Sequence, residues 1–248
     1  YSVLAEGENL DTLAREAVEI FKTLNPKMKT WADWVSNAED GGWEIEIGDQ
    51  IPRRIFKAST LLAGPIVESA FWLSHSYHSG QKRKAGGGAY LSHILSVGEL
   101  LRRENKTDPD IEVIATGYCH DLLEDTSCSE QEIKEKCGEN VLKIVKAVTN
   151  DKELDQKNLW EEKKLKYIST VEAGGKKAMM VCLADKIANA RALVELKKEI
   201  GEDVWKKFNR GKKEKMWFEE SVLAMLKKHL AEHDFVHEYE ELIKNMQT

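Results

Sequence analysis

The chain is short of proline, with four in 248 residues, and it has no glycine- or serine-rich tract. Charged residues make up 32% and hydrophobic residues 42%, a composition typical of a folded soluble domain and not of a disordered chain. No apolar run reaches the roughly 20 residues that a membrane-spanning helix needs. The first 21 residues are too polar for a signal peptide. We therefore expect a cytoplasmic protein that has no membrane partner.

Cysteine and positive charge are also limited. The four cysteines form no Cys-x-x-Cys pair, which argues against a zinc knuckle or a redox motif, and they are too few for a disulfide framework in a chain of this length. Acidic residues outnumber basic ones by 43 to 37. A general nucleic-acid-binding protein needs a basic face, so we expect no nucleic-acid partner.

Helical periodicity is what the sequence does contain, over most of its length. It predicts an all-α protein with an irregular helical bundle. Residues 1–54 are expected to form a mostly helical extension, with one stretch near Trp43 that could be a strand. Residues 55–248 are expected to form the main domain, with its motifs within 66–196 and further helices over 200–248. The helices are expected at 55–78 (with a kink near Pro65), 90–105, 110–122, 129–137, 140–149, 158–172, 176–198, 201–209, 212–231 and 236–246.

A histidine and an aspartate, His120 and Asp121, stand together at the end of the apolar helix predicted there. Imidazole and carboxylate are two ligand types that suit a divalent metal. Polar groups in an apolar helix are costly unless they are paired or coordinated. Glu124 and Asp125 follow one turn later, where they could reach toward a metal without binding it, as a general acid or base should.

Two other apolar helices carry similar polar residues. Asp185 and Asn189 are four residues apart and share a helix face, and His93 lies in the apolar segment 90–95. Taken singly, each has an ordinary interpretation as a satisfied structural residue. Three apolar helices that each contribute His or Asp favour one shared metal site.

The order of these residues, H…HDxxED…LADxxxN, resembles the signature of the HD-domain phosphohydrolases. The neighbouring segments are similar to those of a narrower group, the hydrolase domains of RelA/SpoT proteins and the small alarmone hydrolases. The resemblance covers about residues 66–196. It is carried by HSGQKRK at 78–84 (family HxGQxRK), YLSH at 90–93 (YxxH), CGENV at 137–141 with AVTNDK at 147–152 (FGxxV…VTxDK), and LADKIANARAL at 183–193 (KLADKLxNLRxL).

This resemblance implies a bundle of the HD-domain type that hydrolyses the 3′-pyrophosphate of the alarmone (p)ppGpp, giving GDP or GTP and pyrophosphate in the stringent response. Glu124 and Asp125 would position and deprotonate a metal-bound water. The implied metal is Mn²⁺, with another divalent ion as the alternative, and a homodimer is left open. The implied metal ligands are His93, His120, Asp121 and Asp185. The implied contacts to a guanosine nucleotide are Arg83 and Lys84 (base and phosphates), Lys152 (pyrophosphate) and Asn189 (ribose, or orientation of the ligands).

Departures from the family pattern surround the expected nucleotide pocket. The loop RKAGGGAY at 83–90 is one residue longer than the family's RKSGxPY and lacks its proline, and Ile94 stands where proline is common. Two alternatives therefore remain open. One is an HD phosphatase acting on another nucleotide, such as a nucleoside monophosphate or the 2′-phosphate of NADPH. The other is a non-catalytic binding module, which should have lost ligands that this chain retains.

A second histidine group, His229, His233 and His237, has H-x3-H-x3-H spacing. On one continuous helix these side chains would share a face and could bind zinc or nickel. Asp234 could start a new helix, however, and the flanking residues are charged. The favoured interpretation is a solvated helix face.

Overall fold

The computed structural model of the protein describes residues 65–83, 88–104, 109–151 and 159–248. The expected N-terminal extension, including the stretch near Trp43, and the first turns of the helix expected at 55–78 lie outside the described residues. Within these ranges the chain is helical. An isolated bridge between Lys82 and Ala89 closes the loop that precedes the second described helix.

The bounds of the helices follow the predicted pattern closely, which confirms an all-α fold. The segment expected at 201–209 is a 3-10 helix, η1. No described helix is long and apolar enough to cross a membrane. The elements are α4 (Pro65–His78), α5 (Tyr90–Glu104), α6 (Ile111–Cys119), α7 (Leu122–Asp125), α8 (Glu130–Cys137), α9 (Glu139–Val148), α11 (Trp160–Ala173), α12 (Gly175–Ile200), η1 (Gly201–Lys207), α13 (Gly211–Leu230) and α14 (Asp234–Gln247).

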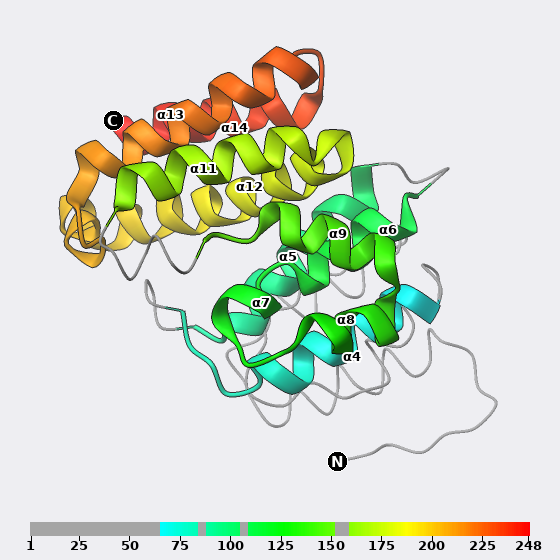
Figure 1. The fold of residues 1–248 in the computed structure, drawn as a ribbon. Helices are drawn as coiled ribbons and strands as arrows, with labels where there is room; N and C mark the ends of the chain where they lie inside the picture. Colours follow the sequence, from blue (N-terminus) through cyan, green and yellow to red (C-terminus); the bar gives the residue numbers. More distant parts are fainter. Residues whose placement is uncertain (1–64, 84–87, 105–108, 152–158) are drawn as a thin grey trace, which may run out of the picture.

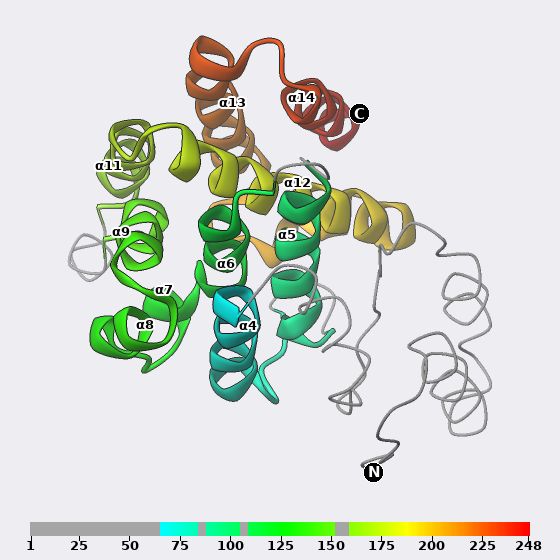
Figure 2. The ribbon, with the colours of Figure 1, turned by 90° about the vertical axis from the view of Figure 1, so that its right-hand side faces the viewer.

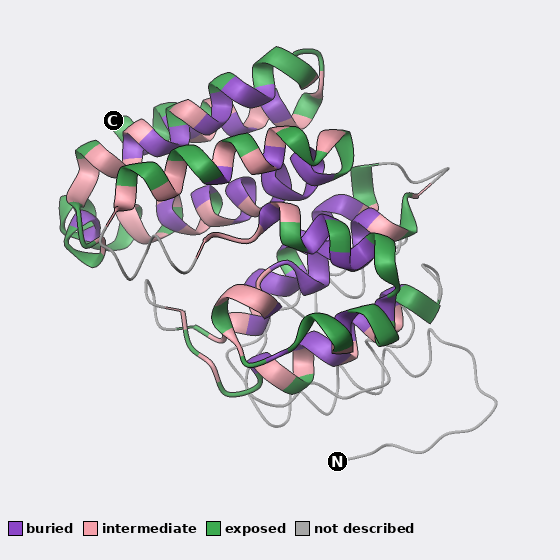
Figure 3. Ribbon diagram, in the orientation of Figure 1, coloured by how far each residue is buried: buried purple, intermediate pink, exposed green. Residues whose placement is uncertain are grey.

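The long helix α12 lies in the middle of the molecule (Figures 1 and 2). It contacts α5, α6 and α9 on one side and α11, α13 and α14 on the other. Its middle turns are almost wholly buried, with Leu183, Ala184 and Ile187 all inaccessible to solvent (Figure 3). The polar residues on this helix therefore lie next to the core, and not on an outer face.

Helices α5 and α6 cross closely because glycine stands at their contact. A Cβ atom added to Gly98 of α5 would lie 2.4 Å from the Tyr118 ring, and one added to Gly117 of α6 would lie 2.6 Å from Leu101. Such distances leave no room for a side chain. This close crossing brings His93, on α5, near to His120, just after α6.

The helix predicted at 110–122 is wrong in its last part. Helix α6 ends at Cys119, and a separate single turn, α7, starts at Leu122. The imidazole Nδ1 of His120 lies 2.8 Å from the Gly117 carbonyl oxygen, which in a continuous helix would accept from the amide of Asp121. The break places His120 and Asp121 on a turn. Their side chains are thereby directed toward α12.

Candidate metal centre and substrate cavity

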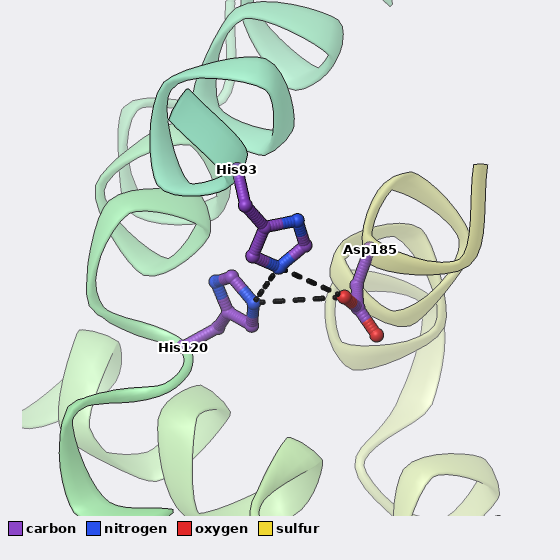
Figure 4. Close-up of side chains that lie close together, drawn as sticks. All are labelled: His93, His120 and Asp185. Carbon is purple, nitrogen blue, oxygen red and sulfur yellow. Dashed lines mark hydrogen bonds and ion pairs between the residues drawn. The ribbon is translucent and has the colours of Figure 1, made fainter. Parts of the chain in front are cut away.

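Three of the predicted ligands meet between α5, the turn after α6, and α12 (Figure 4). The Nε2 atoms of His93 and His120 are 3.2 Å apart. Oδ1 of Asp185 lies 3.2 Å from His93 Nε2 and 3.7 Å from His120 Nε2. The ligand atoms of these three residues all lie within 4.8 Å of one another, which is close enough for a single ion to bridge them.

The fourth predicted ligand, Asp121, faces the same point. Its Oδ2 atom lies 3.0 Å from His120 Nε2 and 3.5 Å from His93 Nε2. Two imidazole nitrogens and two carboxylate oxygens therefore surround one position. This mixture of donors suits a borderline divalent ion.

The orientation of His120 is fixed from behind. A carbonyl oxygen only accepts hydrogen bonds, so Nδ1 of His120 must donate to the oxygen of Gly117, 2.8 Å away. The exchangeable position is then Nε2, which points at the other three donors. A backbone carbonyl that fixes the tautomer in this way is a common feature of metal-binding histidines.

The electrostatics of the site favour positive charge. Burial alone would raise the pKa of Asp121 and of Asp185, but the two imidazoles, with Lys186 beside Asp185, hold the pKa of each carboxyl well below its usual range. Burial would lower the pKa of His120, but the two carboxylates raise it well above its usual value. Two ionised carboxylates that face two imidazole nitrogens form a donor set that a divalent ion fits.

Asp185 is itself held by two neighbours, and a third residue holds one of these two. Lys186 donates to Oδ2 at 2.9 Å, and Asn189 donates to Oδ1 at 2.6 Å. Arg83 in turn donates to Oδ1 of Asn189 at 2.7 Å. Two of the four predicted nucleotide contacts, Arg83 and Asn189, therefore lie together beside the metal ligands. The other two, Lys84 and Lys152, lie outside the described residues.

The predicted acid–base pair lies on α7 at the edge of the donor cluster. Glu124 accepts hydrogen bonds at Oε2 from the backbone amide and side-chain amide of Asn150, at 3.1 and 2.8 Å. Asp125 is exposed, and its Oδ2 lies 2.7 Å from the hydroxyl of Tyr90. The same hydroxyl lies 2.6 Å from Oδ2 of Asp121. Sequence reasoning missed Asn150 and Tyr90 as site residues, although both lie in motifs that it had noted.

All of these residues line one cavity of about 730 Å³. One wall of it is formed by α11, η1 and the start of α13, and this wall carries four cationic side chains, three of them next to aromatic rings. Burial, together with the charge of nearby Lys186, lowers the pKa of Lys164 to about 8. The cation–ring pairs are Lys164 with Phe218 (4.5 Å), Arg210 with Trp160 (5.4 Å) and Lys215 with Phe208 (5.5 Å), and Lys207 completes the wall.

Sequence reasoning also missed this cationic wall. The segment KKFNRGKKEK at 206–215 is rich in basic residues, but a charge run of this kind is usually a solvated face. Only the packing of η1 and α13 over the cavity distinguishes the two cases.

Two histidines of the C-terminal run, His229 and His233, lie next to separate carboxylates. His229 Nε2 lies 2.6 Å from Glu172, and His233 Nε2 lies 3.1 Å from Glu104. Nδ1 of His233 also accepts from the amide of Phe235 at the start of α14. His233 therefore separates α13 from α14, so the three histidines are not on one continuous helix.

Comparisons with known proteins identify the family of this chain. A family model described as an HD domain matches residues 70–210, more than half of the chain. Two relatives are named guanosine-3′,5′-bis(diphosphate) 3′-pyrophosphohydrolase MESH1. The one from Danio rerio is 28% identical over 128 residues, 52% of this chain and 68% of the relative. The one from Mus musculus is 29% identical over 131 residues, 53% of this chain and 70% of the relative.

A bacterial relative from Aquifex aeolicus, named guanosine-3′,5′-bis(diphosphate) 3′-pyrophosphohydrolase, is 32% identical over 133 residues. These are 54% of this chain but only 18% of that longer protein. One similar solved structure is described as a metazoan ortholog of SpoT that hydrolyses ppGpp. It has a TM-score of 0.60 at 22% sequence identity, and the match covers 73% of this chain and 95% of that protein's chain. A structure from Listeria monocytogenes has a TM-score of 0.54 at 28% sequence identity, and the match covers 64% of this chain and 96% of that protein's chain. The chain is a member of the HD-domain family.

Proposed function

We propose that this protein is a metal-dependent phosphohydrolase that removes the 3′-pyrophosphate of ppGpp or pppGpp, giving GDP or GTP and pyrophosphate. The observation that carries the proposal is a single cavity lined both by four converging candidate metal donors and by the cationic side chains of α11, η1 and α13. The names of the relatives support the same substrate.

The proposed metal ligands are His93, His120, Asp121 and Asp185, with Mn²⁺ as the ion. The carboxylate oxygens suit a hard ion such as Mn²⁺ and the imidazoles suit other divalent ions, so the choice of Mn²⁺ rests on the family resemblance. A divalent ion held by these residues would supply two things, a lowered pKa of a coordinated water and polarisation of a phosphoryl oxygen. Lys186 and Asn189 keep the Asp185 carboxylate oriented toward the histidines.

Glu124 and Asp125 are the proposed acid–base residues. Asn150 holds Glu124 with two hydrogen bonds, so this carboxylate is fixed and suited to orienting the attacking water. Asp125 is exposed on the cavity side of α7 and is suited to taking the proton of that water and passing it to solvent.

The cavity suits a nucleotide in size and charge. Its volume of about 730 Å³ lies within the range of roughly 300–1,000 Å³ that is usual for small-molecule sites. A substrate phosphorylated at both ends of the ribose could place one group at the metal and the other at the cationic wall. Arg83 and Asn189 lie beside the proposed ligand Asp185, where they could contact a nucleotide bound at the metal. Lys84 and Lys152 remain predicted contacts, as do a homodimer and a cytoplasmic location.

The test is product release by purified protein with Mn²⁺ from ppGpp, pppGpp, NADPH and nucleoside monophosphates. We expect pyrophosphate from the two alarmones. We expect this release of pyrophosphate to be lost in Asp121→Asn, which removes the charge of one proposed ligand at constant size. The matched control is Asp203→Asn, which should keep full activity. Within the described part of the chain, Asp203 is exposed and is paired only with Lys206, its neighbour on η1. Orthophosphate from NADPH or a monophosphate, without pyrophosphate from alarmones, would contradict the proposed substrate.

A further inference from the structure

One hydroxyl links a predicted metal ligand to a predicted proton acceptor. Oη of Tyr90 lies 2.6 Å from Oδ2 of Asp121 and 2.7 Å from Oδ2 of Asp125. The Asp121 oxygen is the same atom that faces the two imidazoles. Since a tyrosine has a single hydroxyl proton, it donates to one carboxylate at a time, and it couples the positions of the two.

Asp125 depends on such contacts for its position. It is exposed, and it ends α7, which is a single turn of four residues. A helix this short has little stability of its own and needs tertiary contacts to persist. The carboxylate of Asp125 would otherwise be free to turn toward solvent.

A second contact holds the backbone of the same residue. Nε2 of Gln81 donates to the carbonyl oxygen of Asp125 at 3.1 Å. The backbone carbonyl of Gln81 accepts from the amide of Tyr90 at 2.9 Å. Gln81 therefore ties the end of α7 to the start of α5, where the linking hydroxyl originates.

His78 supports both of these residues from the core side. Its ring is fully buried and stacks on the ring of Tyr90, with centroids 4.9 Å apart and planes at 20°. Its Nδ1 lies 2.7 Å from Oε1 of Gln81. With the Gln81 oxygen engaged in this way, the amide nitrogen is the atom left to face Asp125.

We propose that Tyr90 and Gln81 are positioning residues for Asp125, and that His78 orients both of them. The inference rests on the proposed function, because it gives Asp125 its role in proton transfer. It assigns a purpose to the HSGQ segment at 78–81, which otherwise only precedes the basic loop.

The variants for the test are Tyr90→Phe and Gln81→Met, which each remove hydrogen bonds at nearly constant volume. The matched control is Tyr77→Phe. Tyr77 is the neighbour of His78, and its hydroxyl donates at 2.5 Å to Glu132, a carboxylate outside the cavity. Both tyrosine variants lose a short bond to a carboxylate, but only one of these bonds lies at the site.

The first readout is steady-state hydrolysis of ppGpp with saturating Mn²⁺. Because a well-placed acid–base residue contributes about 10²–10⁴-fold to rate, we expect Tyr90→Phe and Gln81→Met to lower kcat by about tenfold or more. In Gln81→Met, KM and the affinity for Mn²⁺ should stay within about twofold, since Gln81 contacts none of the proposed ligands and does not line the cavity. Tyr77→Phe should keep kcat.

The second readout needs no substrate. Hydrogen–deuterium exchange of the amides over 122–126 should be faster in Gln81→Met than in the natural protein, and unchanged in Tyr77→Phe. An unchanged rate in Gln81→Met would overturn the inference. So would a kinetic loss confined to KM, or one that follows the loss of Mn²⁺ affinity. If the natural protein releases no pyrophosphate from any alarmone, the proposed function fails, and the exchange rates alone decide the positioning inference.

Discussion

The charge of a side chain in the cavity depends on its neighbours, and for Lys164 this dependence can be measured by varying the pH. It packs over the ring of Phe218 and lies 3.4 Å from Oδ1 of Asn150, the residue that holds Glu124. Burial and the charge of Lys186 lower its pKa to about 8. Below that pH the ammonium is charged and attracts phosphate, and above it the amine is neutral.

We therefore expect kcat/KM for ppGpp to fall as the pH rises through about 8, because kcat/KM reports the ionisation of the free enzyme. Lys164→Arg should remove this fall, since a guanidinium stays charged throughout the range. The measurement is a pH profile of kcat/KM from 6 to 9.5 (roughly the span over which such a group titrates) for both proteins. An identical alkaline limb in Lys164→Arg would assign the fall to another group.

At the same scale, the residues that sequence reasoning found and missed differ in a physical way. The ligand set of His93, His120, Asp121 and Asp185 was implied by the family resemblance, and polar side chains in three apolar helices favoured a shared metal site for a physical reason, because such groups need a partner. Their convergence is observed, and their role as ligands is part of the proposal. Tyr90 and Asn150 were missed because neither is unusual in its own segment. Their importance depends on which carboxylate they face, which only the folded arrangement determines.

At the scale of the helix, the crossing of α5 and α6 is the feature that assembles the histidines. Gly98→Ala would place a Cβ 2.4 Å from the ring of Tyr118, which is buried and cannot move aside freely. Overpacking of this kind costs about 1–3 kcal/mol of the free energy of unfolding. It should also separate His93 from His120 and so weaken Mn²⁺ binding.

The measurements are chemical denaturation and titration with Mn²⁺. The control is Ser96→Ala, an exposed position on the same helix, which should change neither quantity appreciably. Normal stability and normal Mn²⁺ affinity in Gly98→Ala would contradict the account of the crossing.

Helix positions were predicted well because apolar periodicity records which face is buried. The helix expected at 110–122 was wrong at its end because His120 has no breaker beside it in the sequence. Its imidazole bonds to the carbonyl of Gly117, and this contact becomes favourable only where the ring turns toward the other ligands. The break is thus a property of the site more than of the local sequence.

At the scale of the whole molecule, the C-terminal helices α13 and α14 complete the cavity. Glu219 of α13 is 1% exposed, and its carboxylate is bonded to Lys215, in the cavity wall, and to the hydroxyl of Tyr239 on α14. Burial would raise its pKa, but Lys215 and nearby Lys186 hold the pKa of Glu219 below its usual value. A single buried carboxylate thus joins the wall to the last helix.

Removal of that carboxylate should be costly. Glu219→Ala removes the carboxylate that accepts from the buried hydroxyl of Tyr239, and loss of a buried hydrogen-bond partner typically costs about 1–3 kcal/mol. We expect a lower melting temperature together with a higher KM for ppGpp, because Lys215 loses its anchor. Lys213→Ala, at an exposed position on the same helix, is the control and should leave both values nearly unchanged. A stable Glu219→Ala protein with an unaltered KM would show that α14 does not support the wall.

The cavity wall could not be predicted from the sequence because it depends on how helices far apart in the chain pack together. The resemblance to alarmone hydrolases ends near residue 196, and the wall is formed by residues as far along the chain as Lys215 and Phe218. Basic and aromatic residues in that stretch fit an outer helix face equally well. Only the packing of α13 against α11 and α12 directs them inward.

The proposed metal ligands and the cationic wall come from different stretches of the chain. The donors lie on α5, the turn after α6 and α12, whereas three of the four cations come from the joint between η1 and α13. On the proposed function, the residues that would break the bond and those that would bind the rest of the substrate can therefore change independently in evolution. Substitutions in the joint would then change which phosphorylated compound is accepted and leave the hydrolytic residues as they are.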